Sequence, residues 1–340
     1  MGRMPKNSIC TKVQIRNLME RYKYIPPEDR KLIINSQGNE IVVPYPVDIR
    51  ETQIKRPELT SYEEALEWNK QAQEHTERAV GMLQEYAEVR LNPVDNNKIF
   101  LVNGSDIHWG HNDVDYDFLD SSLKIIEDTP NMAMAMGWNI LDGAIPAQFP
   151  DGLLWSGQSA QEQVYTFREK LKQLNDKNKL LAAIGDAACH EGWMKKKAGW
   201  SVYRELFADI NIPLLTNGGA LDVSVGEQKY RLALFHKPKY WSSLNKTHGG
   251  YRLMDRTADA EIVFTSHYHS ASVGQETRYN APFEKDVAVV ASGTCKVMDH
   301  WALANFGTNG TRGFQGIILY ADRHKFQVVY DLEVAKDLMK

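Results

Sequence analysis

The stretch Lys98–Gly110 reads KIFLVNGSDIHWG, an apolar run followed by Asp106 and His108, which stand two residues apart. A short apolar run of this kind is typical of a buried strand. Two metal-ligating side chains just beyond the end of a strand would lie at the edge of a sheet and face one pocket. The stretch therefore predicts a strand that ends at a candidate site.

Four later apolar runs are followed by side chains of the same chemical kind. Because loops at the same edge of a sheet with parallel strands share one crevice, we expect these side chains to converge. They are Asn139 and Asp142 after Met132–Met136, Asp186, Cys189 and His190 after Leu180–Ile184, His236 after Leu234–Phe235, and His267 and His269 after Phe264–Thr265.

The chemistry of this set points to metal ions. Imidazole and carboxylate groups bind Mn, Fe, Zn or Ni. Five or more such groups exceed what a single tetrahedral ion requires. We therefore predict two divalent ions, whose identity the sequence leaves open among these four metals.

Helical stretches separate the first strands, notably at Asp117–Glu127 and Ser159–Leu174, whereas the later apolar runs lie closer together. Helices between strands favour parallel pairing, and short connections favour antiparallel pairing. We expect a mixed α/β fold with helices on the outside. This domain would occupy residues 96–340.

Residues 1–95 are predicted to form an N-terminal extension. Ser61 and Glu64 have the spacing of a capping box, which opens a helix predicted over about residues 61–89. Upstream of it, we expect a hairpin over residues 32–43 and a short helix over residues 12–24.

The composition is that of a globular protein, with 340 residues of which 43% are hydrophobic and 25% charged. A net charge of -4 gives no global attraction to nucleic acid or anionic lipid. There is no apolar run of membrane-spanning length and no signal peptide, so we expect a cytoplasmic protein without a membrane partner. The three cysteines lie far apart, which argues against a disulfide framework or a zinc knuckle.

The order of the motifs SDIHWG, GWNILDG, AACHEGW, LALFHKP and TSHYHS resembles that of calcineurin-like metallophosphoesterases. The resemblance covers about residues 97–295, and the closing segment VVASGTCKVMDHW is similar to phage and bacterial members related to repair exonucleases. It implies a four-layer αββα sandwich with a metal crevice at the strand ends.

The same resemblance implies roles for individual residues. His190 would contact the substrate phosphate and assist the leaving group. Asn139 stands in the place of the Asp that bridges two ions, and Cys189 in the place of a metal-bound Asn. The implied ligands are Asp106, His108 and His269 for one ion, and His236 and His267 for the other.

The two departures have physical consequences. Asn139 carries no charge where a carboxylate would neutralise part of two dications, so at least one ion should bind more weakly. Two other carboxylates are alternative metal ligands. Asp142 could serve if its loop had a different conformation, and Asp186 could serve if the motif around Cys189 were aligned differently. Cys189 as a thiolate would restore one negative charge and favour Zn or Fe over Mn.

We expect a metal-dependent phosphoester hydrolase with a dinuclear site. Within this class, a phosphodiesterase or nuclease that acts on nucleic acid or a nucleotide is favoured. The alternative is a degenerate phosphoesterase fold that serves as a binding or scaffold protein with one metal ion or none. Lys195–Lys197 would attract a polyanion, although a solvated charge run is the commoner explanation of such a stretch.

Overall fold

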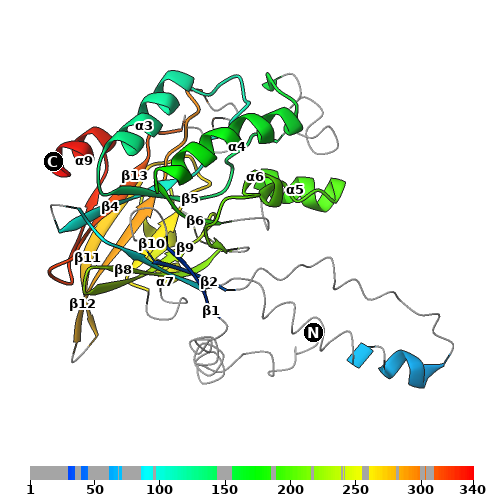
Figure 1. Cartoon of the computed structure of the whole chain (residues 1–340), viewed down its shortest axis with the longest axis horizontal. Coiled ribbons are helices and arrows are strands. Elements are labelled where there is room, and N and C mark those ends of the chain that lie inside the picture. The colour runs from blue at the N-terminus through cyan, green and yellow to red at the C-terminus, as the bar shows by residue number, and fades with distance from the viewer. Residues whose placement is uncertain are drawn as a thin grey trace.

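The computed structural model describes residues 30–34, 40–44, 61–67, 69–70, 86–94, 97–143, 155–184, 189–215, 218–238, 240, 242–254, 260–280, 283–298, 303 and 310–340. These residues form a mixed α/β fold with one six-stranded and one eight-stranded sheet (Figure 1). The fold class predicted from the sequence is confirmed.

The six-stranded sheet has the order β14-β13-β4-β5-β6-β7. Its strands β4 to β7 pair in parallel, and β13 and β14 extend it in antiparallel fashion beyond β4. The strands are β4 (Lys98–Gly104), β5 (Met132–Met136), β6 (Leu180–Ile184), β7 (Leu214–Leu215), β13 (Gln315–Tyr320) and β14 (Phe326–Val329).

The eight-stranded sheet has the order β1-β2-β3-β8-β9-β10-β12-β11. Three of its pairs are parallel, namely β3 with β8 and β10 with both β9 and β12. The strands are β1 (Arg30–Ile34), β2 (Glu40–Pro44), β3 (Tyr86–Leu91), β8 (Gly219–Val225), β9 (Gln228–Leu234), β10 (Ile262–Thr265), β11 (Ser272–Asn280) and β12 (Phe283–Ala291).

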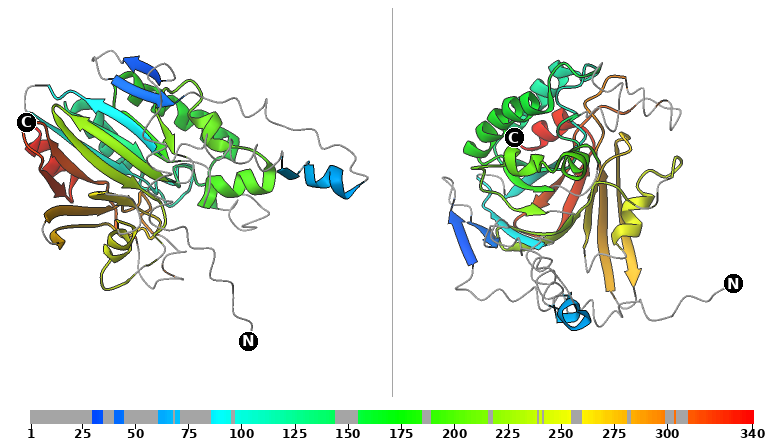
Figure 2. Two further views of the ribbon diagram at one scale, coloured as in Figure 1. Left: turned by 90° about the horizontal axis from the view of Figure 1, so that it is seen from below. Right: turned by 90° about the vertical axis from the view of Figure 1, so that its right-hand side faces the viewer.

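Helices lie along the outer face of the six-stranded sheet, and one helix lies against part of the eight-stranded sheet (Figure 2). Contacts join α3 to β5, α4 to β6 and α9 to β14 on the six-stranded sheet, and α7 to β10 and β12 on the other. The helices are α3 (Tyr116–Asp128), α4 (Ala160–Asp176), α5 (Cys189–Ala198), α6 (Val202–Leu206), α7 (His248–Met254) and α9 (Leu332–Leu338). No helix in this described part of the chain is long and apolar enough to cross a membrane, and the cytoplasmic location stays a prediction.

The helix predicted over residues 61–89 is wrong at its C-terminal end. Burial alternates along β3, with Ala87, Val89 and Leu91 facing inward, which is the period of a strand rather than a helix. Because β3 pairs with β8, the core sheet includes a strand from before residue 95. Residues 71–85 lie outside the described part.

Two other N-terminal predictions are confirmed. β1 and β2 form the expected antiparallel hairpin. The capping box is present, because the Glu64 amide donates to Ser61 Oγ at 3.1 Å and the Ser61 amide donates to Glu64 Oε2 at 3.2 Å. The helix predicted over residues 12–24 lies outside the described residues.

Candidate metal centre

The loops after β4 and β5 run side by side beyond the ends of their strands. The Asp106 amide donates to Trp138 O at 3.0 Å, and the His108 amide donates to Asn139 O at 2.9 Å. The Asp142 amide donates back to Trp109 O at 2.9 Å. These bonds hold the two strand-end motifs in fixed register.

A buried asparagine ties this edge of the six-stranded sheet to the other sheet. Asn103 Nδ2 donates to Thr265 O at 2.9 Å and to Val290 O at 3.0 Å. In return, Ser292 Oγ donates to Asn103 O at 3.2 Å. The loop that follows β10, which carries His267 and His269, is thereby brought to the loops after β4 and β5.

The backbone is strained where these loops meet. Among the described residues, nine that are not glycine have positive φ, and five of them are predicted site residues. Such a conformation costs on the order of 1–2 kcal/mol per residue and persists where surrounding contacts enforce it, typically at functional sites. The five are Asp106 (φ 53°), His108 (55°), Asn139 (54°), His267 (80°) and His269 (52°).

Asp106, His108 and His269 form a buried group whose ligand atoms converge. His108 Nε2 and His269 Nε2 are 3.0 Å apart, and His269 Nε2 lies 3.7 Å from Asp106 Oδ1. Two nitrogens bound to one Zn ion at about 2.0–2.1 Å would be separated by roughly 3 Å. The spacing therefore suits a shared ion.

The state of His108 also fits a metal ligand. Burial, and then the nearby charge of Lys296, hold its pKa well below 6.5, so the imidazole is neutral. Its Nδ1 is buried without a hydrogen bond, and Asp142 Oδ1 is 3.6 Å away. Metal-bound imidazoles commonly direct their second nitrogen toward a carboxylate, so these residues fit a divalent ion.

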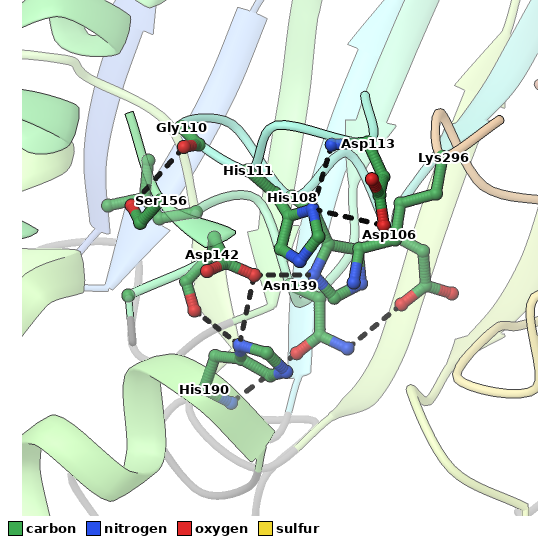
Figure 3. A network of polar contacts seen from close by, with 12 residues as sticks. Asp106, His108, Gly110, His111, Asp113, Asn139, Asp142, Ser156, His190 and Lys296 are labelled. Carbon is green, nitrogen blue, oxygen red and sulfur yellow. Dashed lines mark hydrogen bonds and ion pairs between the residues drawn. The ribbon is translucent and has the colours of Figure 1, made fainter. Parts of the chain in front are cut away.

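His190 lies beside Asp142 and Asn139 (Figure 3). It is half-buried at the start of α5, and its ring stacks on Trp193 with centroids 4.7 Å apart. His190 Nδ1 contacts the backbone oxygen of Asp142 and lies 3.8 Å from Asp142 Oδ1. Asp142 thus faces both His108 and His190.

His236 and His267 form a second imidazole pair, with His236 Nε2 and His267 Nδ1 3.1 Å apart. His236 Nδ1 contacts Ser266 Oγ at 2.6 Å. Burial, and then the neighbouring His267, hold the pKa of His236 well below 6.5. Burial, with Lys237 next, lowers the pKa of His267 to about 3, so both rings are neutral.

Asn139 sits between the two groups. Its Nδ2 donates to Asp106 Oδ1 at 3.0 Å and lies 3.3 Å from His236 Nε2. Its backbone amide donates to Glu191 Oε2 at 3.1 Å, and the Leu141 amide donates to Glu191 Oε1 at 3.0 Å. Burial raises the pKa of Glu191 to about 7, although these hydrogen bonds act to lower it.

Three residues of the site were not predicted from the sequence, namely Asn103, Glu191 and Lys296. Glu191 directly follows His190, which was the available signal, whereas nothing in the sequence marked the other two. Lys296 is only 6% exposed and is the charge with the largest effect on His108.

The structure brings together seven of the eight predicted site residues. The backbone of Cys189 begins α5, but its side chain lies outside the description, as does Asp186. The seven are Asp106, His108, Asn139, His190, His236, His267 and His269.

The fold and site define an α/β protein with a candidate metal centre where the edges of two sheets meet. No family model matches the chain, and no curated protein matches it in sequence. Zn-complexed Vps29 from Entamoeba histolytica is similar at 12% identity and a TM-score of 0.33, covering 68% of this chain and 98% of that one.

Two further solved structures are similar to the same degree. A predicted phosphoesterase from Streptococcus pneumoniae matches at 12% identity and a TM-score of 0.28, covering 68% of this chain and 98% of the other. A hypothetical protein from Pyrococcus horikoshii matches at 13% identity and a TM-score of 0.32, covering 71% and 92%. Similarity at these values does not indicate a function for this chain.

Proposed function

We propose that this protein is a metal-dependent phosphoester hydrolase. The observation that carries the proposal is the buried group of Asp106, His108 and His269, with the half-buried His190 close to Asp142, which also faces His108. A carboxylate and two imidazoles form a ligand set for a divalent transition metal. Bound there, the ion would polarise a phosphoryl oxygen and lower the pKa of a bound water.

The chain's own residues supply the proton chemistry. His190 Nδ1 contacts the backbone oxygen of Asp142, and we propose that the Nε2–H group of this ring donates a proton to the leaving oxygen. The carboxylate of Asp142, 3.8 Å from His190 Nδ1, favours the protonated imidazole that this role requires. Stacking on Trp193 fixes the plane of the ring.

Within this class we propose a phosphodiester substrate, in a nucleic acid or a nucleotide. Lys195–Lys197 are exposed on α5, the helix that begins beside His190, and would attract the phosphates of a polyanion. Trp193 is half-buried and offers an aromatic surface for a base. The motif resemblance to phage and bacterial repair exonucleases agrees with this choice.

The test is hydrolysis of bis-p-nitrophenyl phosphate and p-nitrophenyl phosphate with Mn, Zn, Fe or Ni, followed by single-stranded and duplex DNA. We expect the diester to be hydrolysed in preference to the monoester. His108→Ala should reduce the rate by at least about 100-fold, because it removes a ligand. An inactive protein with every ion would refute the proposal.

The second candidate is a binding or scaffold protein with one ion or none. The position of the Asn139 amide favours this second candidate. Its Nδ2 donates to Asp106 Oδ1 and lies 3.3 Å from His236 Nε2, so two atoms that could bind a metal have a protein partner instead. It predicts a folded protein that hydrolyses neither substrate under any of the four ions.

A further inference from the structure

We propose that the centre holds one divalent ion rather than two, and that the amide of Asn139 takes the place of the second. This inference rests on the proposed function, since it concerns the same site. The ion belongs to Asp106, His108 and His269, while Asn139 links Asp106 to His236 by hydrogen bonds (Figure 3 shows the Asn139–Asp106 bond).

The amide nitrogen of Asn139 uses both of its hydrogens on atoms that a second ion would need. Nδ2 is 3.0 Å from Asp106 Oδ1 and 3.3 Å from His236 Nε2, and those two atoms are themselves 4.0 Å apart. An N–H group donates and cannot ligate a cation. A cation between the two atoms would meet the hydrogens of this amide.

The opposite orientation of the amide is disfavoured by α5. The His190 backbone amide approaches Asn139 Oδ1 at 3.4 Å. It belongs to the first turn of the helix, where backbone N–H groups have no partner within the helix. Turning the oxygen toward Asp106 and His236 would set the Asn139 NH₂ group against the His190 N–H, donor to donor.

The surroundings of the two imidazole pairs also favour a single ion. His236 has a contact at each ring nitrogen, Ser266 Oγ at Nδ1 and the Asn139 amide and His267 at Nε2. The two pairs have similar spacings, with 3.1 Å between His236 Nε2 and His267 Nδ1 and 3.0 Å between His108 Nε2 and His269 Nε2. The difference is the Asn139 amide, whose N–H points at the lone pair of His236 Nε2 that a second ion would require.

Charge leads to the same conclusion. The buried charged side chains of the centre, among the described residues, are the acidic Asp106, Asp142 and Glu191 and the basic Lys296. With Asp106 and Asp142 ionised and Lys296 protonated, one dication leaves a net charge of about zero or +1, depending on whether Glu191 is ionised. Two dications would leave two or three buried positive charges with no bridging carboxylate, which is a costly arrangement.

An aspartate at position 139 would reverse these conditions. One carboxylate oxygen could still accept from the His190 amide, while the other would face Asp106 Oδ1 and His236 Nε2 as a ligand instead of a donor. The added negative charge would offset part of a second dication. Asn139→Asp should therefore create a second ion site.

The experiment measures metal content of the full chain, stripped with chelator, reloaded with Mn or Zn alone and analysed by mass spectrometry and calorimetric titration. We expect about one ion in the wild-type protein and about two in Asn139→Asp. With Mn, the electron spin resonance of the wild type should be that of an uncoupled ion, and Asn139→Asp should show exchange coupling.

Two single-histidine variants test the assignment independently, in case Asn139→Asp does not fold. His108→Ala should lose the ion, and His236→Ala should keep about one. His324→Ala, a histidine paired with Glu261 outside the centre, controls for adventitious binding. Circular dichroism verifies the fold of each variant.

The outcomes separate this inference from the proposed function. Two ions of similar affinity in the wild type, no ion, or loss of the ion in His236→Ala but not in His108→Ala would overturn the single-ion inference. One ion without hydrolysis of either nitrophenyl substrate would support it and refute the proposed function.

Discussion

Asn103 links the two sheets by hydrogen bonds beside the candidate metal centre, so its replacement tests how much this contact stabilises the fold. Asn103→Leu keeps the side chain similar in size and removes the NH₂ group that donates to Thr265 O and Val290 O. Each buried hydrogen bond contributes about 1 kcal/mol net. Thr265 O retains the Ser292 amide at 2.8 Å, so the variant should lose about 2 kcal/mol of unfolding free energy rather than more.

The assay is equilibrium unfolding in urea, followed by tryptophan fluorescence and by circular dichroism to verify a single transition. Thr277→Ala is the matched control, because its hydroxyl bond to Asp286 Oδ1 is exposed and should contribute within about 0.5 kcal/mol. Metal affinity should fall in Asn103→Leu, since β10 leads to His267 and His269. An unfolding free energy equal to that of the wild type would refute the reasoning.

Three further variants probe other contacts. Tyr230→Phe removes a buried hydroxyl beside three carbonyls of residues 320–325 and should cost about 1–3 kcal/mol in urea unfolding, whereas a neutral result would exclude a role for this hydroxyl in anchoring β13 and β14. Burial lowers the pKa of Lys179 from 10.5 to about 8, so the protonated side chain destabilises the fold most at low pH. The unfolding free energy of the wild type relative to Lys179→Met should therefore rise by about 1–3 kcal/mol between pH 7 and 10.5. A difference that stays constant with pH would show that burial does not lower this pKa. Asp142→Asn should lower kcat and metal affinity by about 10–100-fold. It should also move the alkaline limb of the pH–rate profile to lower pH, because protonated His190 loses a nearby carboxylate. An alkaline limb at the wild-type pH would show that Asp142 does not act on His190.

The sequence predicted the strands with continuous apolar runs best. β5 and β6 match the predicted ranges, because both faces of these central strands are buried. β8 and β11 were missed, since Asp222 and Ser224 interrupt one and polar residues dominate the other. β3 was read as a continuation of a helix, because nothing local marked its pairing with β8.

The convergence of the site residues followed from a local rule, since side chains beyond the ends of parallel strands share an edge. The hydrogen bonds that decide its chemistry are not local. Asn103 acts across to the other sheet, and Glu191 reaches back to the loop after β5. Such partners depend on how loops far apart in the chain approach one another, which neither spacing nor periodicity contains.

Position 139 connects the stability of the fold with the chemistry of the centre. Its backbone has positive φ, its amide proton binds Glu191, and its side chain joins Asp106, His236 and the start of α5. These bonds help to hold a strained loop without a metal ion. A carboxylate there would face that of Asp106 and require a cation between them, so the fold would depend on metal binding. Under the single-ion proposal, the neutral amide therefore removes a second ion site and gives a loop whose shape does not depend on a metal ion.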